Sequence, residues 1–191
     1  MQNLNELAQQ IHENAKAKGF WDEPRNTGEI FMLIVSELAE ALEADREGKR
    51  ADMKKFAVGH DGSITDEQWL PLAFQASIKD TFEDEIADVV IRILDWCAYD
   101  KIDIEERLLK ISVVDFPKNI YKNIGESLMS TTTLLSSAYI AEDDDEATAL
   151  IASSVKSCFR ISEENGFDLM RHIELKMKYN ATRDILHGKK Y

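Results

Sequence analysis

Two segments of the chain each carry a pair of carboxylates three residues apart within an apolar run that has helical periodicity. The pairs are Glu37 with Glu40, and Glu85 with Asp88. Side chains at i and i+3 lie on one face of a helix, so each pair projects its two acids together. In both segments, which cover about 28–47 and 81–98, apolar residues recur with the i, i+3, i+4 spacing of a helix that faces a core. Glu37 and Glu85 fall inside those apolar stripes, so we predict two facing helices with carboxylates between them.

Carboxylates that approach one another in a core require a cation. An ionised carboxylate removed from water is costly unless a partner compensates it, and like charges cannot compensate one another. Mg²⁺ binds a few carboxylates together with water and phosphate oxygens. We therefore interpret Glu37, Glu40, Glu85 and Asp88 as ligands of Mg²⁺, for which Mn²⁺ is a natural substitute. The alternative is that these acids border the core with their charges directed into solvent.

Both acid pairs and the end of the chain resemble the MazG-like, all-α nucleoside triphosphate pyrophosphatases. The resemblance is carried by ExxE in the first segment, ExxD in the second, and Lys176, Asn180 and Arg183 near the end. It covers residues 8–47, 81–104 and 166–190. Ser36 departs from the family, which often has a further acid at the opening of the first motif.

The resemblance implies a helical bundle and a reaction. Family members, whose relatives include dCTPase- and dUTPase-like enzymes, hydrolyse a nucleoside triphosphate to the monophosphate and pyrophosphate with Mg²⁺. The four acids would then be the catalytic and metal-binding residues, and Lys176, Asn180 and Arg183 would hold the phosphates. These three residues also share one helical face, at i, i+4 and i+7, although a solvated basic stripe would show the same spacing.

His12 and Trp21 resemble the base-pocket residues of the deoxycytidine triphosphatase-like branch. In that branch a histidine on the first helix and an aromatic residue shortly after it line the pocket. An indole offers a flat face for stacking, and an imidazole offers a directional hydrogen bond. The resemblance therefore implies a pyrimidine deoxynucleotide as the substrate. Ordinary packing of both rings is the alternative.

The composition indicates a soluble, helical protein of one domain over residues 1–191. Three prolines and eight glycines favour long helices over many turns. A formal net charge of −13 argues against nucleic acid and anionic membranes as partners. The two cysteines match no metal-ligand spacing and are expected to be free thiols, as in a reducing cytoplasm. No apolar run approaches the length of a membrane span, and the polar start lacks the features of a signal peptide.

Two regions extend the chain beyond the family pattern. Residues 48–80 form an unusually long link between the acid-bearing helices, and we interpret them as an insert. We predict an extra helical hairpin over residues 119–164. It resembles a degenerate copy of the acid-bearing hairpin, in which Leu134 and Ser137 stand in place of Glu37 and Glu40. If this hairpin fills the role of a second chain, each chain is a self-contained bundle, and any further association is expected to be a homodimer.

Two other functions are compatible with acids on facing helices. A carboxylate-bridged di-iron protein normally needs Glu-x-x-His pairs, and no histidine in the chain has a glutamate three residues before it. A non-catalytic nucleotide-binding or regulatory bundle is the stronger alternative, because a protein that only binds can keep the same acids.

Overall fold

The fold is all-α, as the sequence predicts. The computed structural model describes residues 3–58, 65–111 and 122–188, which form nine α-helices and one short 3₁₀ helix and contain no strand. In chain order the helices are α1 (Leu4–Ala17), α2 (Thr27–Arg46), α3 (Met53–Val58), α4 (Asp66–Ser77), α5 (Phe82–Tyr99), α6 (Ile104–Lys110), α7 (Ile124–Ile140), α8 (Asp144–Asn165), α9 (Leu169–Thr182) and η2 (Ile185–Gly188).

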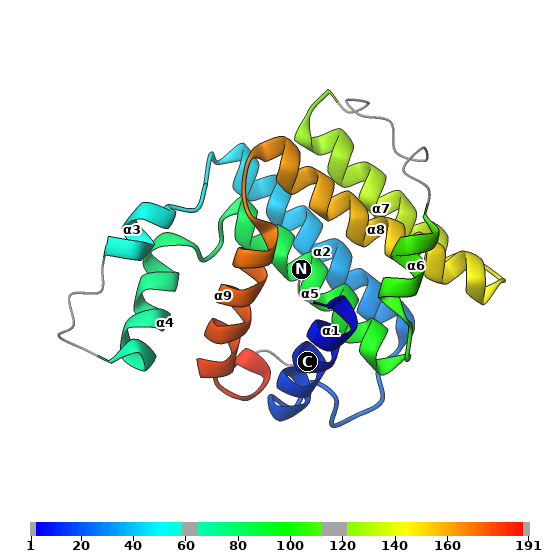
Figure 1. Cartoon of the computed structure of the whole chain (residues 1–191), viewed down its shortest axis with the longest axis horizontal. Helices are drawn as coiled ribbons and strands as arrows, with labels where there is room; N and C mark the ends of the chain where they lie inside the picture. The colour runs from blue at the N-terminus through cyan, green and yellow to red at the C-terminus, as the bar shows by residue number, and fades with distance from the viewer. Residues whose placement is uncertain (1–2, 59–64, 112–121, 189–191) are drawn as a thin grey trace.

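The two acid-bearing helices, α2 and α5, form the centre of the bundle (Figure 1). They run in opposite directions. The start of α5 lies beside the end of α2, where the Phe82 N–H donates to the Lys49 carbonyl at 3.2 Å. Asn26 caps α2 and Thr81 caps α5 through their side-chain oxygens. Ile34 and Ile86 are fully buried between them. The prediction that the acid-bearing helices face each other is confirmed.

Two further helices and a hairpin pack around this pair. α1 and α9 both pack on α5, while α7 and α8 form a hairpin that covers α2 and α5 from another side (Figure 1). A buried hydrogen bond of 2.7 Å joins Thr131 of α7 to Ser157 of α8. The extra hairpin predicted over 119–164 thus corresponds to α7 and α8, with 119–121 outside the described residues. Its origin as a duplication stays a prediction.

The insert over 48–80 contains α3 and α4, and residues 59–64 within it lie outside the described ranges. These two helices share a small hydrophobic cluster with α9. The cluster consists of Phe56, Phe74, Ile78, Leu175 and Tyr179. The rings of Phe74 and Tyr179 stack at 4.5 Å between centroids with 12° between planes. The insert is therefore a packed helical unit that supports one side of α9.

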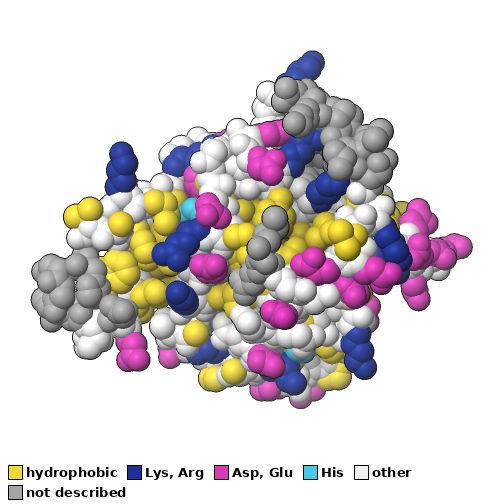
Figure 2. Space-filling model, in the orientation of Figure 1, with side chains coloured by type: hydrophobic (Ala, Val, Ile, Leu, Met, Phe, Trp, Pro, Cys, Tyr) yellow, Lys and Arg dark blue, Asp and Glu magenta, His cyan; other side chains and the backbone are white. Residues whose placement is uncertain are grey.

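Exposed side chains are of mixed character. Acidic groups are spread over the face seen in Figure 2, and hydrophobic side chains gather toward its α3–α4 end. Val58 and Leu72 are among the exposed apolar residues of that region. Among the described helices, none combines the length and the apolar character that a membrane crossing requires.

Candidate functional site

A cavity of about 360 Å³ lies between α1, α2, α5 and α9, and its size is typical of a small-molecule site. All four predicted acids line it. Basic groups from several elements share its wall, namely Lys18, Arg25, Lys79, Arg92, Lys176 and Arg183. Its apolar lining consists of Ile11, Ala15, Phe20, Trp21, Ile30, Leu33, Ile91, Trp96 and Met177. One cavity therefore combines acids, cations and aromatic surface.

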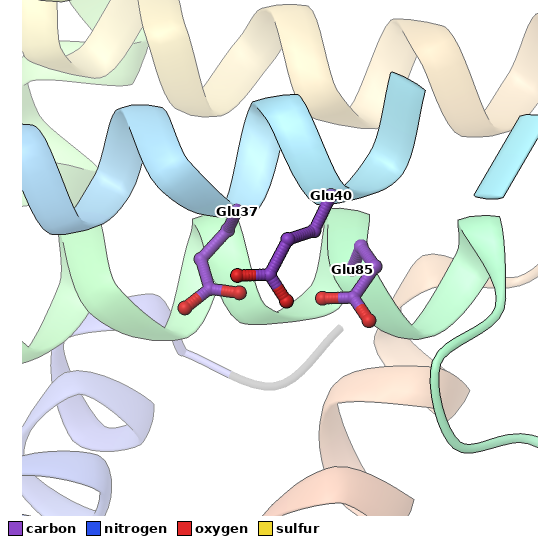
Figure 3. A group of neighbouring side chains, drawn as sticks. All are labelled: Glu37, Glu40 and Glu85. Carbon is purple, nitrogen blue, oxygen red and sulfur yellow. The ribbon is translucent and has the colours of Figure 1, made fainter. Parts of the chain in front are cut away.

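Three of the acids converge closely enough to share one cation. Glu37, Glu40 and Glu85 each offer a carboxylate oxygen within 4.8 Å of the others. Figure 3 shows the three side chains reaching the same side of the α2–α5 pair. The Glu85 side chain is buried, yet it has no hydrogen bond or ion pair with any residue that the structure describes. A buried carboxyl group in that situation needs either a proton or a cation to neutralise it, and hard oxygen ligands suit Mg²⁺, so this donor set fits the predicted metal.

The environment of these acids opposes their negative charge. Burial raises the pKa of Glu85 to about 9, and the nearby charge of Asp88 acts in the same direction. Burial likewise raises the pKa of Glu37, with a further contribution from Asp88, although Arg92 works against the shift. The Nε of Arg92 donates to Glu37 at 2.6 Å. Arg92 thus compensates Glu37 in part, whereas Glu85 forms no ion pair with a described residue and only the nearby charge of Lys176 opposes its shift.

Asp88 lies on the same wall but has a different partner. Its Oδ2 is 2.6 Å from the Nζ of Lys176, and the same Nζ donates to both oxygens of Asp84 at 2.9 Å. Burial alone would lower the pKa of Lys176, but the two carboxylates outweigh it and raise the pKa above its ordinary value. The structure therefore places Lys176 in a buried ion triad. The role of Asp88 as a fourth metal ligand stays a prediction.

The remaining residues predicted on α9 also reach the cavity. Asn180 lines it, and its buried Oδ1 has no hydrogen-bond partner within the described ranges. Arg183 lines it too, one residue beyond the end of α9. The structure thus brings Asn180 and Arg183 together with the acids, as their shared helical face suggests.

The two predicted base-pocket residues meet at Asp95. The Nε1 of Trp21 donates to both oxygens of Asp95, at 3.0 and 3.1 Å, and the Nδ1 of His12 lies 2.7 Å from Oδ1. Burial raises the pKa of Asp95, while the hydrogen bonds from His12 and Trp21 oppose that shift. Trp21 and Asp95 line the cavity, whereas His12 lies behind them, outside its described lining.

The sequence interpretation missed Asp84, Arg92 and Asp95. Arg92 and Asp95 follow Glu85 at i+7 and i+10, positions that continue the face of the acid pair for two more turns of α5. That spacing could have identified them. Asp84 has no such signal, because its partner Lys176 is distant in the sequence.

The raised pKa values predict a pH-dependent stability. Between pH 7 and 9 the folded protein keeps a proton on Glu85 that the unfolded chain, with an ordinary pKa of 4.5, has already lost. The folded state then binds more protons, so the free energy of unfolding should fall as the pH rises, by about 1–2 kcal/mol over this window. Urea unfolding in a chelator at pH 7 and pH 9 measures it. The variant Glu85→Gln, which cannot titrate, should show a smaller fall, and a wild-type stability that rises over this range would contradict the prediction.

The chain matches no protein-family model, no curated protein and no solved structure. A functional assignment therefore has to rest on the residues of the site and their geometry.

Proposed function

We propose that the protein is a Mg²⁺-dependent nucleoside triphosphate pyrophosphohydrolase, a distant relative of the MazG-like enzymes. One observation carries the proposal: three carboxylates from α2 and α5 lie within 4.8 Å of one another on the wall of a cavity that also holds basic and aromatic side chains. Acids in such a group suit a hard cation, and basic groups beside them suit phosphates. The choice of pyrophosphohydrolysis among phosphate reactions rests on the resemblance of the acid pairs and the α9 residues to that family.

The order of groups along α5 supports a nucleotide as the ligand. Glu85, Asp88, Arg92 and Asp95 follow one another over about 15 Å of helix, at a rise of roughly 1.5 Å per residue. The acids occupy the first part of this row, and Asp95 with its partner Trp21 occupies the last part. A ligand with a charged phosphate chain at one end and a planar ring at the other matches that order.

Each group has a role that its position supports. Glu37, Glu40 and Glu85 would hold Mg²⁺, which when bound neutralises phosphate charge and lowers the pKa of a coordinated water. Arg92 keeps Glu37 oriented through its Nε, and its terminal amino groups have no hydrogen-bond partner among the described residues. Those N–H groups would donate hydrogen bonds to a phosphate oxygen of the substrate. Trp21 would stack on the base, for which a pyrimidine is the first choice.

The test is pyrophosphate release from a panel of ribo- and deoxynucleoside triphosphates, with Mg²⁺ and with a chelator. We expect release of pyrophosphate together with the monophosphate, dependent on Mg²⁺, with pyrimidine deoxynucleotides among the best substrates. Release of single inorganic phosphates would indicate a different phosphohydrolase. Tight nucleotide binding without any hydrolysis would favour the non-catalytic, regulatory bundle.

A further inference from the structure

Asp95 holds the aromatic wall of the cavity in a fixed position. An ionised carboxylate only accepts hydrogen bonds, so the 2.7 Å contact requires the proton of His12 on Nδ1. The same carboxylate accepts the Trp21 Nε1–H on both oxygens. Trp21 belongs to the loop between α1 and α2, so these bonds fix a loop residue on the rigid helix α5. The plane of the indole is thereby set by Asp95.

One side of that indole is already covered. Tyr99, one turn beyond Asp95 on α5, stacks on Trp21 with 4.1 Å between centroids and 19° between planes. Tyr99 lies outside the described lining of the cavity, whereas Trp21 is part of it. A planar ring entering the cavity therefore meets the indole away from Tyr99. Because the Nε1 edge of the indole is bonded to Asp95, a ring stacked there brings its own edge close to that carboxylate.

The carboxylate has acceptor capacity left for such a ring. Two ionised oxygens offer about four acceptor positions. Oδ1 accepts from both His12 and Trp21, while Oδ2 accepts only from Trp21 among the described residues. The Asp95 side chain is 19% exposed and lines the cavity, so a ligand there can approach the carboxylate, whose Oδ2 has more acceptor capacity left than Oδ1. An N–H of the ligand would satisfy this oxygen, whereas a ligand carbonyl would be repelled by it.

We infer that Asp95 determines base specificity, because its carboxylate accepts from bases that present an amino group and repels bases that present a carbonyl at that edge. The inference rests on the proposed function and deepens it. Among pyrimidines it selects cytosine, whose C4 carries an amino donor, over uracil and thymine, whose C4 carries a carbonyl acceptor. A site with a directional hydrogen bond discriminates such pairs better than an apolar pocket.

The pair dCTP and dUTP tests the inference, because the bases differ in the C4 group and its adjacent ring nitrogen. The unmodified protein should show kcat/KM at least about 100-fold higher for dCTP. Asp95→Asn keeps the shape and one acceptor oxygen for Trp21 and His12 but adds an N–H donor. It should lower the dCTP:dUTP ratio to about 10 or less, mainly through a gain for dUTP. Trp21→Ala is the comparison variant, since losing the stacking surface should lower kcat/KM for both substrates, whereas Asp95→Asn should raise it for dUTP.

Binding provides a second readout that does not depend on hydrolysis. Dissociation constants for dCMP and dUMP, measured by calorimetry without metal, should show the same preference and the same loss of it in Asp95→Asn. Equal kcat/KM for dCTP and dUTP in the unmodified protein, or binding of neither monophosphate, would overturn the inference even if the Asn variant does not fold. A ratio unchanged by Asp95→Asn would also overturn it, and pyrophosphate release would then leave the proposed function standing. Preference for dCMP without any pyrophosphate release would support the role of Asp95 and count against the proposed function.

Discussion

Replacing Glu85 with glutamine should lower kcat/KM for triphosphate hydrolysis by about 1,000-fold or more and, in a chelator, raise the melting temperature. Glu85 is a buried acid of the group whose side chain has no hydrogen bond or ion pair with a described residue, and only the nearby charge of Lys176 favours its ionised form. Its amide replacement cannot supply a charged ligand to a cation, and losing electrostatic stabilisation of this kind costs several orders of magnitude in rate. The same amide removes a buried group whose pKa is raised to about 9, so the cost of its ionisation disappears.

Opposite changes in activity and stability distinguish a site residue from a packing residue. Glu43→Gln is a matched control, because Glu43 is exposed on α2, lies outside the cavity lining and pairs with Arg46. It should change neither quantity appreciably. Steady-state kinetics and thermal unfolding with and without Mg²⁺ measure both effects. Wild-type turnover in Glu85→Gln would remove this residue from the site, and a large loss of stability would give it a structural role.

Replacing Lys176 with methionine should destabilise the protein by about 3–5 kcal/mol, the usual cost of removing one partner from a buried ion pair. Lys176 is 5% exposed, and its ammonium lies between Asp84, which is 1% exposed, and Asp88. Methionine keeps much of the side-chain volume but leaves two carboxylates facing each other without a cation. Urea unfolding at pH 7 measures the loss.

A second substitution tests the cause of that loss. Asp84→Asn added to Lys176→Met removes the more deeply buried of the two stranded charges and should recover at least about 1 kcal/mol. Lys178→Met is the control, because Lys178 is exposed on the same helix and should tolerate the change. If Lys176→Met proves as stable as Lys178→Met, the buried triad contributes no net stability.

The sequence was sufficient to predict the centre of the fold and the acids within it. Helical periodicity places Glu37 and Glu85 within the apolar stripes of their helices and so favours an inward position over charges directed into solvent. The structure confirms the facing helices and brings both residues together with Glu40. Local spacing was enough here because each pair lies within one helical turn.

Interactions between distant segments could not be read from spacing. The sequence pattern predicts Lys176 to be a hydrogen-bond donor on a polar helical face. In the structure its side chain is buried against Asp84 and Asp88. Asp95 shares a face with Glu85, but its hydrogen-bond partner Trp21 is a loop residue that is 74 positions away. In both cases the partner is set by tertiary packing, which single-helix periodicity does not report.

Helix α9 belongs to two hydrophobic clusters of unequal size. Ile173 is part of the main core, whereas Leu175 and Tyr179 are buried in the small cluster with α3 and α4. Regions with few buried apolar contacts open locally at a lower free energy than the whole domain, so α3 and α4 are expected to separate more readily than the helices of the main core. When they separate, α9 loses support on one flank, but the ammonium of Lys176 still binds α5. We therefore expect the buried ion triad to hold the cavity wall that carries Asn180 in place when α3 and α4 separate from it.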